Sequence, residues 1–418
     1  MNVTGIIAEY NPFHNGHAYH MEAARQKTNA DFLIVLMSGD FVQRGTPALI
    51  GKFARAKMAL FNGADLVLEL PCAFATSSAE YFSEGAVSIF HELGVVTDLC
   101  FGSETADLSL LSSAADLLLH ETDEFKAQLS DALSKGFTYP QARSKALLSC
   151  MPSSSQQKEL EALLKTPNNI LSIEYLKSLK RRNSFITPHA ISRIHSGYHE
   201  QSLSDTGICS ATAIRSALRE NQQNLSLLRS QMPASSHEIL ETEYQMRGIL
   251  TEDDLSTIVQ YRLLEQKNYS MYLDMNQELS NRLSSVLLPS MSFSELSKTL
   301  KSRQYTLTRI NRALLHILLG ITNEEMLQYK ANQFRSYARI LGLKKRAFPL
   351  LKQMKLHSNI PIIQQLTKAN LSQFELPPSL LQLDLDAHRL YETVLLQKYH
   401  LPHSYYEKEL GRQPFLLS

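Results

Sequence analysis

The stretch AEYNPFHNGH, residues 8–17, lies between a short apolar segment and a longer amphipathic one. An apolar run, a turn that contains proline and glycine, and a helix form the first half of a βαβ unit. His14 and His17 flank Gly16 at the start of the expected helix, where free backbone N–H groups and the helix dipole favour an anion. Imidazoles there can donate hydrogen bonds to a polyphosphate and stabilise the charge on departing pyrophosphate. The stretch therefore predicts a nucleotide site.

The same alternation continues beyond this stretch. Strands are expected at residues 3–8, 32–37, 65–70 and 95–101, helices at 18–27, 52–62 and 78–93, and a fifth strand at 186–194. A later helix opens at Ser210 and Thr212, whose hydroxyls can cap it. We therefore predict a doubly wound, parallel α/β sheet, which binds ligands beyond the carboxyl ends of its strands.

Composition limits the classes of protein that remain. The 418 residues include 42 Lys and Arg and 41 Asp and Glu, so the net charge of +1 is no global sign of nucleic-acid or membrane binding. No apolar run reaches the roughly 18 residues of a membrane span, and the N-terminus lacks the basic leader of a signal peptide. The four cysteines lie far apart without a C-x-x-C pair, so they are expected to be reduced, buried thiols. A cytoplasmic protein with no membrane association and no obligate protein partner is expected.

Two motifs carry a resemblance to a known superfamily. The H-x-G-H of residues 14–17 and the segment ICSATAIR, residues 208–215, resemble the signatures of nucleotidyltransferases with a Rossmann-like HUP fold. Residues 5–17, SGDFVQRG (38–45), FGSE (101–104) and PNNIL (167–171) more closely resemble the tRNA(Met) cytidine acetate ligases. That resemblance implies activation of acetate by ATP to acetyl-adenylate and pyrophosphate. It also implies transfer of the acetyl group to the wobble cytidine of elongator tRNA(Met), which gives N(4)-acetylcytidine.

Composition indicates a domain boundary, and the resemblance implies an ATP site. The Gln-, Asn- and Ser-rich residues 220–236 divide an ATP-binding catalytic domain, 1–225, from a mainly α-helical, basic tRNA-binding region, 226–418. Mg²⁺ is expected with the polyphosphate, although no carboxylate cluster identifies its ligands. The sequence does not distinguish Asn168 from Asn169. The implied ATP contacts are Ile7, Ala8, Glu9, Tyr10, Asn11, Pro12, Phe13, His14, Asn15, Gly16, His17, Ala18, Tyr19, His20, Gly102, Asn168 or Asn169, Arg193, Ser210, Thr212 and Arg215.

Further catalytic candidates follow the second strand. Asp40 is expected to accept a hydrogen bond or a proton from the cytidine amine, unless it only caps a turn. Arg44, Lys52 or Arg55 is expected to pair with acetate or with tRNA phosphate, although Lys52 and Arg55 equally suit a solvated helix face. Glu104 suits either the ribose hydroxyls or a helix cap.

The expected tRNA surface is a local excess of positive charge. Residues 301–355 hold twelve Lys or Arg and two Glu, a net charge of +10, with five interleaved aromatic residues. Phosphates supply affinity for such a surface, and unstacked bases can lie on its rings. The alternative is a solvated helical face whose aromatic residues belong to the core. The expected RNA contacts are Lys52, Arg55, Arg303, Arg309, Arg312, Lys344, Lys345 and Arg346.

Two other functions remain open at this point. A small-molecule adenylyltransferase or a pantothenate-synthetase-like ligase would use the same histidines on a metabolite, without needing a basic helical half. A non-catalytic, ATP-responsive RNA-binding protein would bind ATP without turning it over. Release of pyrophosphate from ATP would distinguish the enzymes, which release it, from the non-catalytic RNA-binding protein, which would not.

Overall fold

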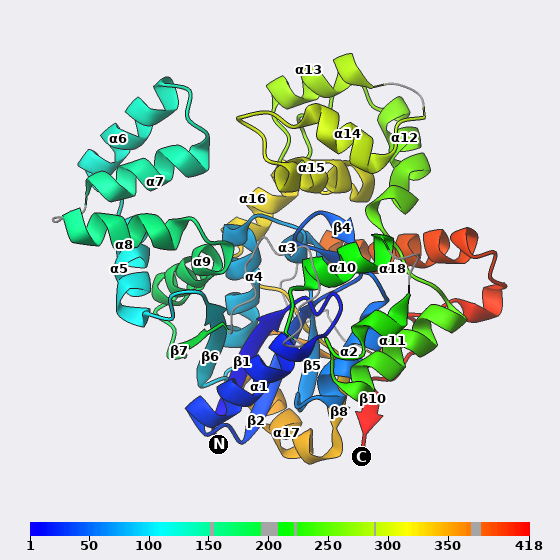
Figure 1. Ribbon diagram of the computed structural model, residues 1–418. Helices are drawn as coiled ribbons and strands as arrows, with labels where there is room; N and C mark the ends of the chain where they lie inside the picture. Colours follow the sequence, from blue (N-terminus) through cyan, green and yellow to red (C-terminus); the bar gives the residue numbers. More distant parts are fainter. Residues whose placement is uncertain (151–153, 194–207, 221–223, 288–289, 369–377) are drawn as a thin grey trace.

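An eight-stranded sheet forms the centre of the molecule in the computed structural model (Figure 1), which describes residues 1–150, 154–193, 208–220, 224–287, 290–368 and 378–418. Five of its strands come from the N-terminal half and run parallel in the order β5-β2-β1-β6-β7. They are β1 (Val3–Ala8), β2 (Phe32–Ser38), β5 (Leu66–Leu70), β6 (Asp98–Ser103) and β7 (Thr187–Ser192). The doubly wound fold is confirmed. Residue 194, the end of the expected fifth strand, lies outside the described residues.

The strand order places a topological switch point between β1 and β6. From β1 the chain proceeds to β2 and β5 on one side, and then returns to add β6 and β7 on the other. The connections after β1 and β6 therefore leave in opposite directions and open a crevice at the carboxyl edge. This crevice is where a ligand is expected.

Helices cover both faces of the sheet because the side chains of its strands alternate between two cores. In β2, Leu33, Val35 and Met37 join one core, and Ile34 and Leu36 join the other. The first core packs against α1 (Asn15–Thr28), α2 (Lys52–Phe61), α10 (Ala211–Glu220) and α11 (Ala234–Met246). The second packs against α3 (Cys72–Ala75), α4 (Ala79–Glu92), α5 (Leu108–Leu119), α9 (Pro167–Arg181) and α17 (Phe348–His357).

Three strands from the C-terminal half complete the sheet, which the sequence analysis did not foresee. β8 (Ala338–Lys344) pairs antiparallel with β5, and β9 (Ile362–Ile363) and β10 (Phe415–Leu417) pair with β8. Residues 226–418 are mainly helical, but the expected boundary at 225 does not bound the sheet. The apolar run in β8 escaped notice because it lies inside the basic segment.

Two groups of helices extend from the sheet (Figure 1). One follows β6 and comprises α5, α6 (Asp123–Ser134), α7 (Tyr139–Ser149) and α8 (Ser154–Leu164). The other lies above the carboxyl edge and comprises α12 (Ser256–Glu265), α13 (Gln277–Val286), α14 (Phe293–Leu300), α15 (Leu307–Leu319) and α16 (Asn323–Ala331). The long helix α18 (Pro378–Lys398) shares the core of this second group. No helix in the described part of the chain is both long and apolar enough to cross a membrane.

A small hairpin joins the second helical group to the sheet edge. It consists of β3 (Phe41–Val42) and β4 (Thr46–Pro47), and its turn includes Gly45 at φ +74°. A Cβ atom on Gly45 would lie 2.3 Å from the backbone nitrogen of Arg312 in α15, so only glycine permits this approach. The hairpin and α15 are therefore held against each other beside the crevice.

Candidate active site

A pocket of about 420 Å³ occupies the switch point, between the carboxyl ends of β1 and β6. Its walls come from β1 and the turn after it, α1, β6, α9 and the start of α10, while the hairpin and α15 contribute further residues. Of the expected ATP contacts, thirteen line it, namely Ile7, Ala8, Glu9, Tyr10, Asn11, His14, Gly16, His17, Tyr19, His20, Gly102, Asn168 and Arg193. The motif following β1 thus supplies most of one wall.

The two motif histidines are held in one tautomer by the start of α1. His14 is the N-cap residue, and its Nδ1 accepts a hydrogen bond from the backbone N–H of Gly16 at 3.1 Å. Nδ1 of His17 accepts from the backbone N–H of His14 at 3.3 Å. A neutral imidazole whose Nδ1 accepts carries its proton on Nε2. The rings stack at 3.7 Å between centroids, so both present an Nε2–H donor from the same helix turn.

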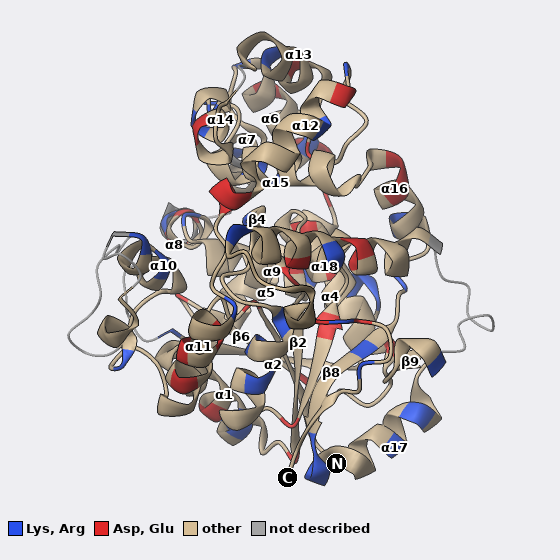
Figure 2. Cartoon of the chain, turned by 90° about the vertical axis from the view of Figure 1, so that its right-hand side faces the viewer, with Lys and Arg blue, Asp and Glu red and all other residues tan. Residues whose placement is uncertain are grey.

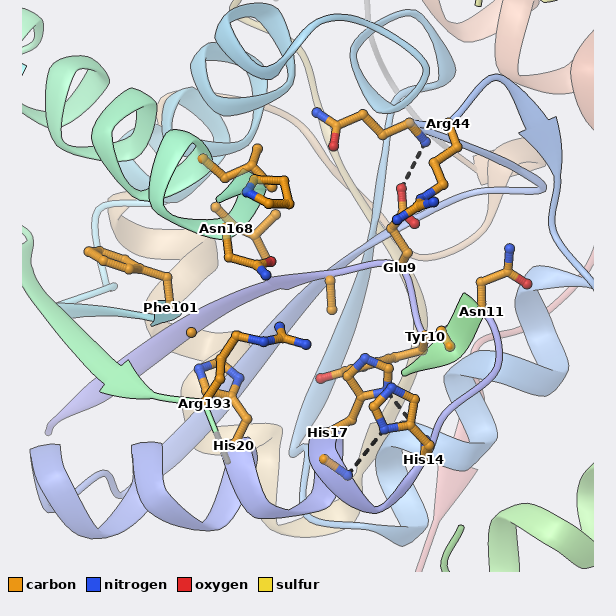
Figure 3. Close-up of a pocket in the computed structure, with 18 of the residues that line it drawn as sticks. Glu9, Tyr10, Asn11, His14, His17, His20, Arg44, Phe101, Asn168 and Arg193 are labelled. Atoms are coloured by element: carbon orange, nitrogen blue, oxygen red, sulfur yellow. Dashed lines mark hydrogen bonds between the residues drawn. The ribbon is translucent and has the colours of Figure 1, made fainter. Parts of the chain in front are cut away.

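The surroundings of these histidines favour the neutral imidazole. Burial, together with the charges of Arg193 and Arg215, lowers the pKa of His14 from 6.5 to about 3. Burial likewise lowers the pKa of His20 to about 4, and that of His17 falls well below its usual value. The imidazoles therefore act on a polyphosphate as hydrogen-bond donors, whereas positive charge comes from Arg193 (Figure 3).

The neutral histidines should make the protein sensitive to mild acid. Between pH 6.5 and about 3 the unfolded chain binds a proton at His14 that the folded chain does not, so the free energy of unfolding falls as pH falls. At pH 5 this amounts to about 2 kcal/mol for His14 alone. Urea unfolding at pH 7.5 and 5.0 checks this. His14→Asn, which keeps a side-chain acceptor for the N–H of Gly16, should lose about 2 kcal/mol less than the wild type on acidification. An equal loss would contradict the assignment.

The two candidate asparagines have different surroundings. Asn168 lines the pocket and donates to Glu104 at 2.6 Å. Asn169 is buried, and its Oδ1 accepts from Ser103 Oγ and from the backbone of Glu104 and Thr105. Glu104 also accepts from the backbone N–H of Asn169 at 3.0 Å, so it caps the start of α9. Asn168 is thus the asparagine available to a ligand.

The second motif supports the first. Ser210 Oγ accepts from the backbone N–H of Ala213 and caps α10, as expected. Arg215 donates to the backbone oxygen of Asn11 at 2.7 Å and to Thr212 Oγ1 at 3.3 Å. None of Ser210, Thr212 and Arg215 lines the pocket, whereas their neighbours Ile208, Cys209 and Ala211 do. In this structure the motif therefore holds the turn after β1 in place.

Asp40 is not available to a substrate, contrary to the expectation. It is 4% exposed and does not line the pocket. Its Oδ1 accepts from the backbone N–H of Lys52 at 2.9 Å, and its Oδ2 lies 2.7 Å from Nδ1 of His388. Burial alone would raise the pKa of Asp40, but the charges of Lys52 and His388 hold it well below its usual range. Asp40 therefore has a capping role, at the start of α2, and it also anchors α18, which the sequence did not indicate.

Lys52 and Arg55 are also buried and cannot bind RNA phosphate. Lys52 is 1% exposed and pairs with Glu69 at 2.7 Å and with Glu409. Arg55 is 0% exposed and donates to the backbone oxygens of Glu9 at 2.7 Å and Ser38 at 3.0 Å, and to that of Gly39. For these two residues, both the predicted RNA contact and the alternative of a solvated helix face are wrong. Arg55 instead fixes the loop that follows β2, and Lys52 connects β5 to the C-terminal segment.

The part of the pocket next to the helical group carries positive charge. Arg44 and Gln43 reach it from the hairpin, and Thr308 and Arg312 from α15. Arg312 forms a bidentate contact with Asp274, at 2.7 and 3.1 Å. Arg309 donates to the backbone oxygen of Asp274, and Arg303 is exposed. Of the expected RNA contacts, Arg312 thus lies at the pocket and Arg309 close to it.

Lys344, Lys345 and Arg346 lie at the opposite edge of the sheet. Because β8 is antiparallel to β5, Lys344 pairs with the amino end of β5 through the backbone oxygen of Asp65. Arg346 forms an ion pair with Asp65 at 3.3 Å. Figure 2 shows α17, which follows them, at the end of the molecule away from α12–α16. The +10 segment is therefore divided between two edges of the sheet.

The aromatic residues of that segment mostly belong to the core. Tyr305, Tyr329, Phe334 and Tyr337 are all buried, and only Phe348 is exposed among the five. They cannot serve as stacking surfaces for bases, so the alternative interpretation is correct for these four. Of the four cysteines, Cys72, Cys100 and Cys209 are buried as expected, whereas Cys150 is half-buried.

Several pocket residues were missed by the sequence analysis. Phe82, Leu171 and Tyr175 supply an apolar wall from α4 and α9, and Gln43 and Thr308 supply polar groups. Apolar residues on amphipathic helices give no sign of which ones face a ligand. Thr308 can be identified as a pocket residue only from the fold, because the packing of α15 against the hairpin brings it to the pocket.

The crevice between β1 and β6, with two imidazole donors and Arg193 beside it, defines a nucleotidyltransferase of the H-x-G-H type. Residues 1–405 match the family described as HIGH Nucleotidyl Transferase. The "tRNA(Met) cytidine acetate ligase" of Clostridium novyi (strain NT) is 40% identical over 369 residues, which are 88% of this chain and 91% of the relative. That of Caldicellulosiruptor saccharolyticus is 38% identical, covering 100% of this chain and 99% of the relative. The chain belongs to the tRNA(Met) cytidine acetate ligase family.

Solved structures agree over the full length. The Thermotoga maritima TmcAL crystal structure with bound alpha-thio ATP has a TM-score of 0.88 and 30% identity, and covers 100% of both chains. The apo form of the same protein has a TM-score of 0.90 and 31% identity. The C-terminal strands and both helical groups are thus part of the shared fold.

Proposed function

We propose that this chain is an ATP-dependent tRNA-modifying ligase. It activates acetate as acetyl-adenylate with release of pyrophosphate, and then transfers the acetyl group to the wobble cytidine of elongator tRNA(Met) to give N(4)-acetylcytidine. The observation that carries the proposal is the pocket at the switch point, where His14 and His17 present Nε2–H donors beside Arg193. The full-length relatives bear the name of this activity.

ATP suits the chemistry of this pocket. The apolar wall of Phe82, Leu171 and Tyr175 can accommodate a base, and the start of α1 with its histidines suits the phosphates. A likeness to a protein solved with alpha-thio ATP supports the same ligand. Adenylation gives acetate a better leaving group, AMP, and the pocket holds the reactants in alignment, an effect on the order of 7–11 kcal/mol.

Mg²⁺ is proposed to accompany the polyphosphate. In the part of the chain that the structure describes, no group of three or more His, Cys, Asp or Glu side chains is placed to hold a metal ion. The phosphates themselves would therefore provide most of its ligands, and Mg²⁺ would offset their negative charge. No residue of this chain is assigned to it.

Acetate and tRNA are proposed to enter from the side of the helical group. Arg44 and Arg312 line that side, and guanidinium groups pair well with carboxylate and with phosphate. Arg303 and Arg309 lie on or next to α15 and are proposed to extend the tRNA contact, whereas Lys344, Lys345 and Arg346 at the far edge are not. A tRNA substrate also supports a cytoplasmic location.

The experiment that tests this function measures pyrophosphate release from ATP with acetate and unmodified tRNA(Met) each added or omitted. We expect release to depend on acetate and the tRNA to contain N(4)-acetylcytidine afterwards, as read by nucleoside analysis. Acetate-independent release would favour a small-molecule adenylyltransferase. If ATP bound without any release, a non-catalytic RNA-binding protein would replace the ligase.

A further inference from the structure

The acetyl transfer needs a proton acceptor that the mechanism above does not supply. The exocyclic amine of cytidine is a weak nucleophile because its lone pair is delocalised into the ring. As its nitrogen bonds to the acetyl carbonyl carbon, the amine must lose a proton, and the bond from that carbon to the AMP oxygen breaks. The electron pair leaves with AMP, and a base placed beside the amine can take the proton as the new bond forms.

The two motif histidines, His14 and His17, do not fit this role. Nδ1 of both His14 and His17 already accepts a backbone N–H, and Nε2 carries the ring proton. Asp40 does not fit either, because it is buried between Lys52 and His388 and does not line the pocket. The groups first considered for proton transfer are therefore occupied or out of reach.

Glu9 is the one carboxylate among the described residues that line the pocket. It lies directly after β1, and Figure 3 shows it across the pocket from His14 and His17, on the same side as Arg44. Its Oε1 accepts from the backbone N–H of Gln43 at 2.8 Å, and its backbone oxygen accepts from Arg55 at 2.7 Å. No hydrogen bond to Oε2 occurs within the described residues. Glu9 is thus held from both ends and retains an oxygen for a substrate.

The charged and titratable groups near Glu9 come from several elements. Arg55 in α2 and Arg215 in α10 act electrostatically on it, as does the Tyr175 hydroxyl in α9. Arg44 and Arg312 line the same side of the pocket, where the tRNA is proposed to enter. A cytidine arriving from that side meets Glu9 before it reaches the phosphates held at the start of α1.

We propose that Glu9 is the general base that accepts the proton of the cytidine amine during acetyl transfer. This inference rests on the proposed ligase function. It assigns the two halves of the reaction to opposite sides of one pocket. The histidines and Arg193 act on the polyphosphate during adenylation, and Glu9 acts only once the amine attacks the acetyl-adenylate.

The test separates the two half-reactions in the Glu9→Gln variant. Glutamine is nearly isosteric and its Oε1 can still accept from Gln43, but it cannot take up a proton. Acetate-dependent exchange of pyrophosphate into ATP should stay within about threefold of the wild type. Single-turnover transfer to tRNA should fall by about 100-fold or more, at unchanged tRNA affinity in filter binding. Hydroxylamine, a much stronger nucleophile, should trap the acetyl group at a near wild-type rate. Glu9→Asp, which keeps a carboxylate, should recover part of the transfer.

The matched control is Glu22→Gln, an exposed carboxylate on α1, which should leave both half-reactions unchanged. Transfer by Glu9→Gln within threefold of the wild type would overturn the proposal. So would an equal loss of exchange and transfer, which would place Glu9 in adenylation. The wild-type exchange reports on the ligase function itself, because its absence would remove that function irrespective of the variant.

Discussion

Replacing His17 with asparagine is expected to lower the rate of acetate-dependent pyrophosphate release by about 100- to 1000-fold. The Nε2–H of His17 is preorganised toward the phosphates, since its Nδ1 accepts from the backbone of His14 at 3.3 Å and its ring stacks on that of His14. Asparagine places an oxygen near the position of Nδ1 and so preserves the cap. It has no group at the position of Nε2. The loss should therefore appear in the rate of adenylation, measured by pyrophosphate exchange at saturating ATP.

His17→Gln is the matched control for this prediction. Glutamine places an amide nitrogen near the position of Nε2 and gives up the acceptor near Nδ1. It should retain clearly more activity than His17→Asn, although its α1 start should be less stable. If asparagine instead were the better replacement, the cap would be the essential contribution of His17 and donation to phosphate would be the wrong mechanism.

The sheet was predictable because its central strands are buried on both faces. A run such as Phe32–Ser38 has apolar side chains for two cores at once, which is typical of a strand that is buried on both faces. The strand is therefore indicated by its own residues, without information from the rest of the chain. The histidines were predictable for a related reason, since their role follows from the local geometry of a strand, a turn and a helix start. Both signals lie within a few consecutive residues.

The errors share a different cause, which is separation along the chain. Lys52 is a cation on a helix, and it lies in the interior because Glu409, 357 residues later, comes to meet it. Asp40 is likewise paired with a histidine 348 residues away. A charged residue has no local sign of such a partner. A charged residue is therefore interpreted from sequence as a surface group or a catalytic group, and this interpretation is wrong where distant segments bury the residue.

The same buried charges make Lys52→Met the substitution with the largest expected effect on stability. Lys52 lies 2.7 Å from Glu69 and 3.7 Å from Asp40, and also pairs with Glu409, all of them buried. Methionine fills a similar volume but leaves these carboxylates with less compensation. Loss of one partner of a buried ion pair typically costs about 3–5 kcal/mol, so urea unfolding at pH 7.5 should show at least that decrease in the free energy of unfolding.

Two comparisons separate the loss of charge from a general effect of the substitution. Lys57→Met changes the same side chain on the same helix, where Lys57 is only half-buried beside Phe415, and should cost less than about 1 kcal/mol. Adding Glu409→Gln to Lys52→Met removes one of the uncompensated charges, so the double variant should be more stable than the sum of the single effects allows. Additive effects would mean that Lys52 and Glu409 do not act on each other. In that case the C-terminal segment would be held to the sheet by Arg339, which also pairs with Glu409, and not by the cation at the start of α2.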